Sequence, residues 1–123
     1  MAHVNSTATG TVTTAATQLA QFYKRALPAN TFTIFGPMLT RGAPRTLIHL
    51  NQILGAVGAT VEVQVSVSDE PADLKYLTVT TLVLPPGAPL TYVNQIPCKY
   101  MRLRVAAPLL VGVTVEAAIM VAQ

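Results

Sequence analysis

Charged residues are scarce in this chain. Only 11% of its 123 residues are Asp, Glu, Lys or Arg, whereas an ordinary soluble domain has about 25%. Hydrophobic residues make up 51%. Because a small domain leaves much of its surface exposed, so few charges do not cover that surface in the usual way. We therefore expect part of the surface to be covered by other copies of the chain and by a partner.

Cysteine and long apolar runs are also scarce. Cys98 is the only cysteine, so no disulfide can form within the chain. The apolar runs are far shorter than the ~20 residues of a membrane helix. The N-terminus lacks the basic and then apolar pattern of a secretory signal. We therefore expect no membrane partner and no secretion signal.

The residues that catalysis and metal binding need are too few or too scattered. His3 and His49 are the only histidines, and no G-x-S-x-G sequence occurs. Cys98, His49, Asp69 and Asp73 share no spacing typical of metal ligands. No glycine-rich loop follows a strand and opens a helix, as a nucleotide-binding fingerprint requires. We expect no enzyme activity, no cofactor and no metal site.

What the chain has instead is alternation of apolar and polar residues. Valines at every second position of residues 60–68 indicate a strand with one buried face. Related patterns, separated by Gly and Pro turns, predict further strands at residues 31–35, 46–53, 74–84, 90–95, 100–105 and 111–121. About seven or eight short strands with such turns are typical of an all-β fold, an antiparallel β-sandwich or jelly roll.

The first part of the chain differs in composition from the rest. Residues 1–28 are predicted to be an N-terminal arm, and residues 29–123 a β-sandwich domain. The arm is rich in Thr and Ala and has no charged side chain before Lys24. We expect it to be extended; the alternative is a short helix over residues 14–27. We also expect residues 1–20 to contact another chain.

Charge and two-sided apolar strands indicate candidate interface positions. Residues 1–60 contain four basic residues and no acid, whereas residues 61–123 contain four basic residues and five acids. The first half is therefore predicted to face an acidic surface. Four dispersed cations make a poor phosphate track, so we expect no nucleic-acid partner. The candidate interface residues are Leu19, Phe22, Tyr23, Lys24, Arg25, Arg41, Arg45, Leu82, Leu84 and Met120.

Three segments carry a resemblance to a known family. They are the alternating strand Val61–Asp69, which ends in Ser-x-Asp, the aromatic-x-Arg-x-Arg-Val strand Tyr100–Val105, and the Val/Thr-rich strand Val111–Val115. In these segments the chain resembles small β-sandwich virion proteins of tailed bacteriophages. The resemblance implies a capsid decoration, or cement, protein. It would be made in the host cytoplasm and bind the major capsid protein on the virion surface as a homo-oligomer, with a trimer favoured.

One alternative function uses the same fold. A head-fibre or tail component with a β-sandwich would bind a carbohydrate or a receptor. Such a site usually presents aromatic side chains, and the chain has four Tyr, three Phe and no Trp. The alternative predicts an exposed tyrosine cluster, with Tyr76, Tyr92 and Tyr100 as its candidates.

Overall fold

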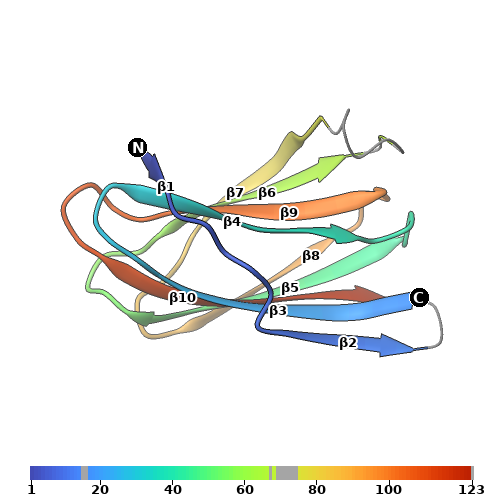
Figure 1. Ribbon diagram of the computed structural model, residues 1–123, viewed down its shortest axis with the longest axis horizontal. Helices are drawn as coiled ribbons and strands as arrows, with labels where there is room; N and C mark the ends of the chain where they lie inside the picture. Colours follow the sequence, from blue (N-terminus) through green and yellow to red (C-terminus); the bar gives the residue numbers. More distant parts are fainter. Residues whose placement is uncertain (15–16, 67, 69–74, 123) are drawn as a thin grey trace.

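The protein is a β-sandwich. The computed structural model describes residues 1–14, 17–66, 68 and 75–122, and within them the chain forms ten strands and no helix. The strands form two five-stranded sheets, which lie as two layers one above the other in Figure 1. The predicted fold class is therefore confirmed. The strand number exceeds the expected seven or eight because the N-terminal region adds three strands.

Each sheet combines strands that are distant in sequence. The first sheet has the order β1 (Ala2–His3), β4 (Thr31–Leu39), β9 (Tyr100–Ala106), β6 (Thr60–Ser66) and β7 (Leu77–Val83). The second sheet has the order β2 (Gly10–Thr14), β3 (Thr17–Leu27), β10 (Val113–Ala122), β5 (Arg45–Leu54) and β8 (Pro89–Asn94). Only the short β1–β4 pairing is parallel among these neighbours.

The core lies between the two sheets and follows the predicted alternation. Every second residue of the central strands points inward, where it loses contact with water. The side chains that are 0% exposed include Ile48, Leu50, Val61, Val63, Met101, Leu103, Val105, Val115 and Ile119. These residues come from four strands of both sheets, so the core depends on pairings between segments far apart in sequence.

The predicted arm supplies strands of the second sheet. β3 lies between β2 and β10, and its register with β10 runs from Leu27–Val113 to Ala20–Met120. The helix over residues 14–27 is therefore wrong, because this segment pairs as a strand. Tyr23 and Leu27 are buried in the core, and the Tyr23 ring stacks on Phe35 with centroids 5.2 Å apart. The expected boundary at residue 28 thus falls inside one continuous sandwich.

Bonds within the chain also hold the first ten residues. β1 pairs with the start of β4, and the Val4 N–H donates to the Phe32 carbonyl at 2.7 Å. The Thr9 N–H donates to the Phe22 carbonyl at 2.6 Å. The N-terminal segment is therefore held by the chain's own two sheets.

Two strand ends differ from the prediction. The Gly36-Pro37 pair, expected to end a strand after Phe35, instead lies inside β4, at a register shift against β9 and with a cis peptide bond. The strand expected over residues 74–84 forms as β7, and residue 74 lies outside the described part of the chain. β4 continues in the same direction past this register shift, because it pairs with β9 both before and after it.

Candidate functional site

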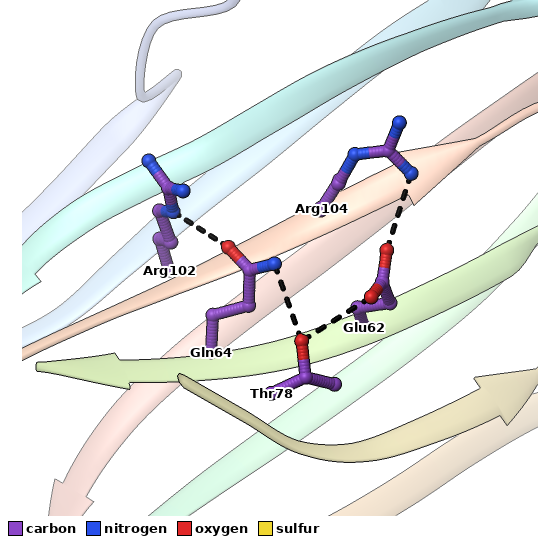
Figure 2. Close-up of polar contacts among 5 residues, drawn as sticks. All are labelled: Glu62, Gln64, Thr78, Arg102 and Arg104. Atoms are coloured by element: carbon purple, nitrogen blue, oxygen red, sulfur yellow. Dashed lines mark hydrogen bonds and ion pairs between the residues drawn. The ribbon is translucent and has the colours of Figure 1, made fainter. Parts of the chain in front are cut away.

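The outer face of the first sheet is a connected polar network (Figure 2). Arg102 Nε donates to Gln64 Oε1 at 2.7 Å, and Gln64 Nε2 donates to Thr78 Oγ1 at 3.4 Å. The Thr78 hydroxyl donates to Glu62 Oε1 at 3.2 Å. Glu62 Oε2 also accepts from Arg104 Nη1 at 3.1 Å. Strands β9, β6 and β7 are therefore tied together on this face by side chains as well as by backbone bonds.

Aromatic rings complete this network. The Arg102 guanidinium lies 3.9 Å from the centre of the Tyr76 ring, and that of Arg104 lies 4.2 Å from the centre of the Phe32 ring. Gln64 and Ser66, which the alternation placed on a wet face, are buried. Polar groups on this face bind one another, so it is suited to stabilising the fold rather than to docking.

The outer face of the second sheet has a different chemistry. In the register of this sheet, Phe22 on β3 lies opposite Ala118 on β10, and Ala118 lies opposite His49 on β5. The next row is apolar throughout. It consists of Ala20, Met120, Leu47 and Val93, from β3, β10, β5 and β8 respectively. We call Ala20, Phe22, Leu47, Val93, Ala118 and Met120 the apolar face.

This apolar face has a hollow in it. Phe22 is 39% exposed, whereas the small Ala118 beside it is 8% exposed. The step between the two side chains, with His49 on the other side, leaves a hollow of about 290 Å³. The His49 ring is fixed by a 3.2 Å hydrogen bond between Nδ1 and Thr91 Oγ1. The hollow is also lined by polar side chains, namely Thr9, Lys24, His49, Asn51 and Glu116.

Charges lie at two ends of the apolar face. Lys24 lies opposite Glu116, next to the Phe22 row. Arg45 lies opposite Ala122 at the far end of the same sheet. Glu116 and Ala122 are both on β10, six residues apart, which is roughly 20 Å along a strand. One end of the apolar face is therefore bordered by the oppositely charged Lys24 and Glu116, and the other end by the cation Arg45.

Four of the ten candidate interface residues gather on this surface. Phe22 and Met120 belong to the apolar face, and Lys24 and Arg45 are its terminal cations. The β3–β10–β5 register brings them together, although Lys24 and Met120 are far apart in sequence. Leu19 lies in β3, but its side chain falls outside the described part of the structure.

The other candidates lie elsewhere. Tyr23 and Leu84 are 4% and 1% exposed, so both are core residues and have no surface for a partner. Tyr23 falls on the inner side of β3, and Leu84 comes directly after β7. Leu82 is half-buried against the same core. Arg25 donates from Nε to the Asn5 carbonyl at 3.1 Å, within the chain.

Arg41 occupies a different site. It lies in the β4–β5 turn with a φ of 53° and borders an open hollow of about 670 Å³ with Leu39, Lys99 and Tyr100. The four basic residues of the first half therefore do not form one patch. Strand alternation and turns direct these side chains to separate places, and that the first half faces an acidic surface stays a prediction.

Four residues of the apolar face were not among the ten candidates: Ala20, Leu47, Val93 and Ala118. Leu47, Val93 and Ala118 come from strands that the sequence predicted, whereas Ala20 comes from the expected arm. What the sequence did not provide was the strand order. Single outward apolar residues can be combined into a surface only when it is known that β5 lies between β10 and β8.

The chain's four tyrosines do not form an exposed cluster. Tyr23 is buried, and Tyr76, Tyr92 and Tyr100 are half-buried. The Tyr76 ring is covered by the Arg102 guanidinium. The aromatic platform that the carbohydrate-binding alternative predicts is therefore not found at these residues.

Two further kinds of site were searched for in the described residues. No group of three or more His, Cys, Asp or Glu side chains in that part of the chain is arranged to hold a metal ion. Nor does any helix there have the length and hydropathy needed to cross a membrane. Cys98 is buried, and its Sγ lies 3.4 Å from Thr40 Oγ1.

Comparisons with known proteins give a fold and no family. No protein-family model and no curated protein matches the chain. The PBSX exported protein XepA has a TM-score of 0.62 at 11% identity, and the match covers 85% of this chain and 38% of XepA. PirA has a TM-score of 0.56 at 8% identity, covering 80% and 92% of the two chains. PliG of Aeromonas hydrophila, a periplasmic inhibitor of g-type lysozyme, has a TM-score of 0.53 at 10% identity, covering 97% and 96%.

Proposed function

We propose that this chain is a structural virion protein, a homo-oligomer that decorates and stabilises a phage capsid. The observation that supports this is the contrast between the two outer faces. On the first sheet, polar side chains of β6, β7 and β9 bind one another. On the second sheet, the apolar face leaves Phe22 and Val93 exposed and Leu47 and Met120 half-buried. A protein that works by being packed against a larger surface needs a face of this kind.

Docking would proceed by burial of the apolar face. Apolar surface removed from water contributes about 25 cal/mol per Å² before the costs of association are subtracted. The hollow beside Phe22 would receive a side chain of the capsid protein. Arg45 at one end, and the neighbouring Lys24 and Glu116 at the other, would meet groups of opposite charge and fix the orientation. Binding at many equivalent capsid sites would add avidity.

The comparison with solved structures adds only the fold. The PBSX exported protein XepA has a fold similar to that of this chain. At 11% identity the likeness concerns the fold alone, so the proposal depends on the apolar face and on the resemblance of the sequence to virion proteins.

The test is co-sedimentation of the purified chain with capsids of the phage or prophage whose genome encodes it. Phe22→Asp places a charge in the apolar face, beside the hollow, and is expected to abolish binding. Met120→Gln is a milder second variant in case Phe22→Asp folds poorly. Leu110→Asp is the matched control, because Leu110 is 92% exposed and lies in the β9–β10 loop. Wild-type chain that stays in the supernatant, or equal binding by Phe22→Asp and Leu110→Asp, would overturn the proposal.

A further inference from the structure

One side of the sandwich is formed by strands that contain no charged residue. Residues 76–98 contain no Asp, Glu, Lys, Arg or His, and they include the whole of β7 and β8. β7 is the last strand of the first sheet and β8 the last strand of the second. We call this side, formed by β7, β8 and the link between them, the uncharged flank.

The two edge strands lie on the same side because of the strand order. β5 and β6 precede β8 and β7 in the two sheets, and a short link of five residues, 84–88, connects β7 to β8. In Figure 1 both strands lie in the faded rear part of the molecule, one in each layer. Among the described residues, no strand pairs with the outer side of β7 or β8, so the flank presents backbone edges of both sheets.

An open edge strand usually carries a feature that prevents pairing with another chain. Charged side chains, prolines and bulges serve this purpose. β7 has such a feature, since its register with β6 shifts where Thr80 and Thr78 face Val63 and Gln64. β8 pairs with β5 without a shift from Pro89 to Asn94. Its only proline is its first residue, so most of the β8 edge is regular, uncharged and open.

We propose that β8 pairs with β8 of a second copy of this chain, antiparallel and about a two-fold axis. The second sheets of the two copies would then form one ten-stranded sheet. This pairing concerns only the self-association within the proposed function and does not depend on capsid docking. It gives a dimer, whereas the sequence resemblance favours a trimer.

Charge favours a second copy as the occupant. The chain carries a formal net charge of +3, so two copies repel each other on average. The uncharged flank is the place where identical surfaces meet without bringing like charges together. Nucleic acid or an anionic membrane would be bound through cations, and residues 76–98 provide none.

Exposed side chains on the flank support the same pairing. Val93 on β8 is 47% exposed, and Leu77 and Val83 on β7 are 74% and 68% exposed. If the two-fold axis is perpendicular to the sheets, the first sheet of one copy lies level with the first sheet of the other. The two second sheets are likewise level with each other. The β7 edges then approach each other beside the β8 pair, which would cover apolar groups that are now open to water. Isologous two-fold contacts are also the commonest form of self-association.

The first experiment measures the mass of the purified chain by sedimentation equilibrium. A dimer of the 13.0 kDa chain is expected. Val93→Lys places two ammonium groups near the two-fold axis and is expected to weaken dimerisation by about tenfold or more. Leu110→Lys adds the same charge at the more exposed Leu110, away from the flank, and is expected to leave the dimer unchanged.

The second experiment locates the contact. In a Cys98→Ser background, Thr91→Cys on β8 should crosslink to its copy with a short bis-maleimide. Thr11→Cys, on the opposite edge strand β2, should not. Phe22→Asp, which tests the apolar face, should leave the dimer intact. A monomeric or trimeric wild type, loss of the dimer in Phe22→Asp, or crosslinking of Thr11→Cys in place of Thr91→Cys would each overturn β8 pairing, and none of these depends on capsid binding.

Discussion

Arg104 and Glu62 form an ion pair across β9 and β6, with Nη1 and Oε2 3.1 Å apart. Their side chains are 31% and 29% exposed, so water screens much of the attraction. A pair of this kind contributes about 0.2–1 kcal/mol to stability. Arg104 has a second contact, because its guanidinium lies over the Phe32 ring, and a cation–π contact of this kind adds roughly 0.5–1 kcal/mol.

These contacts predict an order of stability among variants. Arg104→Ala loses both contacts and should lower the free energy of unfolding by about 1–2 kcal/mol. Glu62→Gln keeps an acceptor for the Thr78 hydroxyl and should cost less than about 1 kcal/mol. Arg45→Ala, at an exposed position on the other sheet, is the control and should change stability by less than about 0.5 kcal/mol. Urea unfolding measures all three; an Arg104→Ala loss no larger than that of Arg45→Ala would contradict the interpretation.

A side chain at Gly58, between β5 of the second sheet and β6 of the first, is expected to clash with the backbone. A Cβ placed on Gly58 would lie 2.1 Å from the Leu84 carbonyl oxygen, which no real contact allows. The Leu84 backbone would have to move, although its N–H donates to the Ala59 carbonyl at 2.9 Å. Gly58→Ala should therefore cost about 1–3 kcal/mol or more.

Gly87 is the matched control for that substitution. Its φ is 76°, and a Cβ there would meet nothing within 4 Å. Gly87→Ala should cost only the penalty of left-handed backbone, about 1–2 kcal/mol. Thermal unfolding of the two variants, followed by circular dichroism, gives the comparison. A Gly58→Ala variant as stable as the wild type would show that the close approach to Leu84 is not maintained.

The sequence predicted strands far better than it predicted their neighbours. Alternation in residues 60–68 and 100–105 depends on one strand alone, and it correctly identified Val63 and Leu103 as inward. The Arg104–Glu62 pair could be anticipated only as one of several pairings, because β9 and β6 are separated by β7 and β8 in sequence. The sheet order, in which β9 lies beside β6, brings Arg104 next to Glu62.

The N-terminal strands could not be predicted for a different reason. Thr17–Leu27 has apolar residues at spacings that suit one face of a helix as well as a strand, and short runs of this kind are ambiguous. What decides for a strand is its position between β2 and β10, where Tyr23 stacks on Phe35. Phe35 belongs to the first sheet, so the residues around Tyr23 in the sequence do not indicate this contact. The sequence predicted the apolar face incompletely for the same reason. Ala118 can be recognised as part of this face only when its place beside Phe22 is known.

Cys98 predicts slow thiol chemistry in the folded chain. Its side chain is 3% exposed, and burial raises the pKa of the thiol, with a smaller opposite effect from the Thr40 hydroxyl. Only the thiolate reacts as a nucleophile. Labelling with a maleimide should therefore be about tenfold slower or more in buffer than in urea. Equal rates in the two conditions would mean that the β8–β9 segment opens readily in the native state.

Tyr23 predicts a loss of stability at high pH. Burial raises its pKa from 10.0 to about 12, because the phenolate would lie among apolar side chains. In the unfolded chain Tyr23 ionises near pH 10, so between pH 10 and about 12 the folded state holds a proton that the unfolded state has lost. Stability is then complete below pH 10 and falls as pH rises toward 12.

The Tyr23→Phe variant isolates this effect. The difference between the two pKa values limits the loss to roughly 3 kcal/mol, and other groups that titrate in this range affect both proteins alike. Tyr23→Phe keeps the stacked ring and loses the hydroxyl that donates to Gln21 Oε1. Its free energy of unfolding should be lower than that of the wild type at pH 8, and the gap should narrow or reverse as pH rises above 10. Parallel pH profiles for the two proteins in urea unfolding would show that Tyr23 is not buried as a neutral phenol, and the packing of β3 against β4 would then have to be reconsidered.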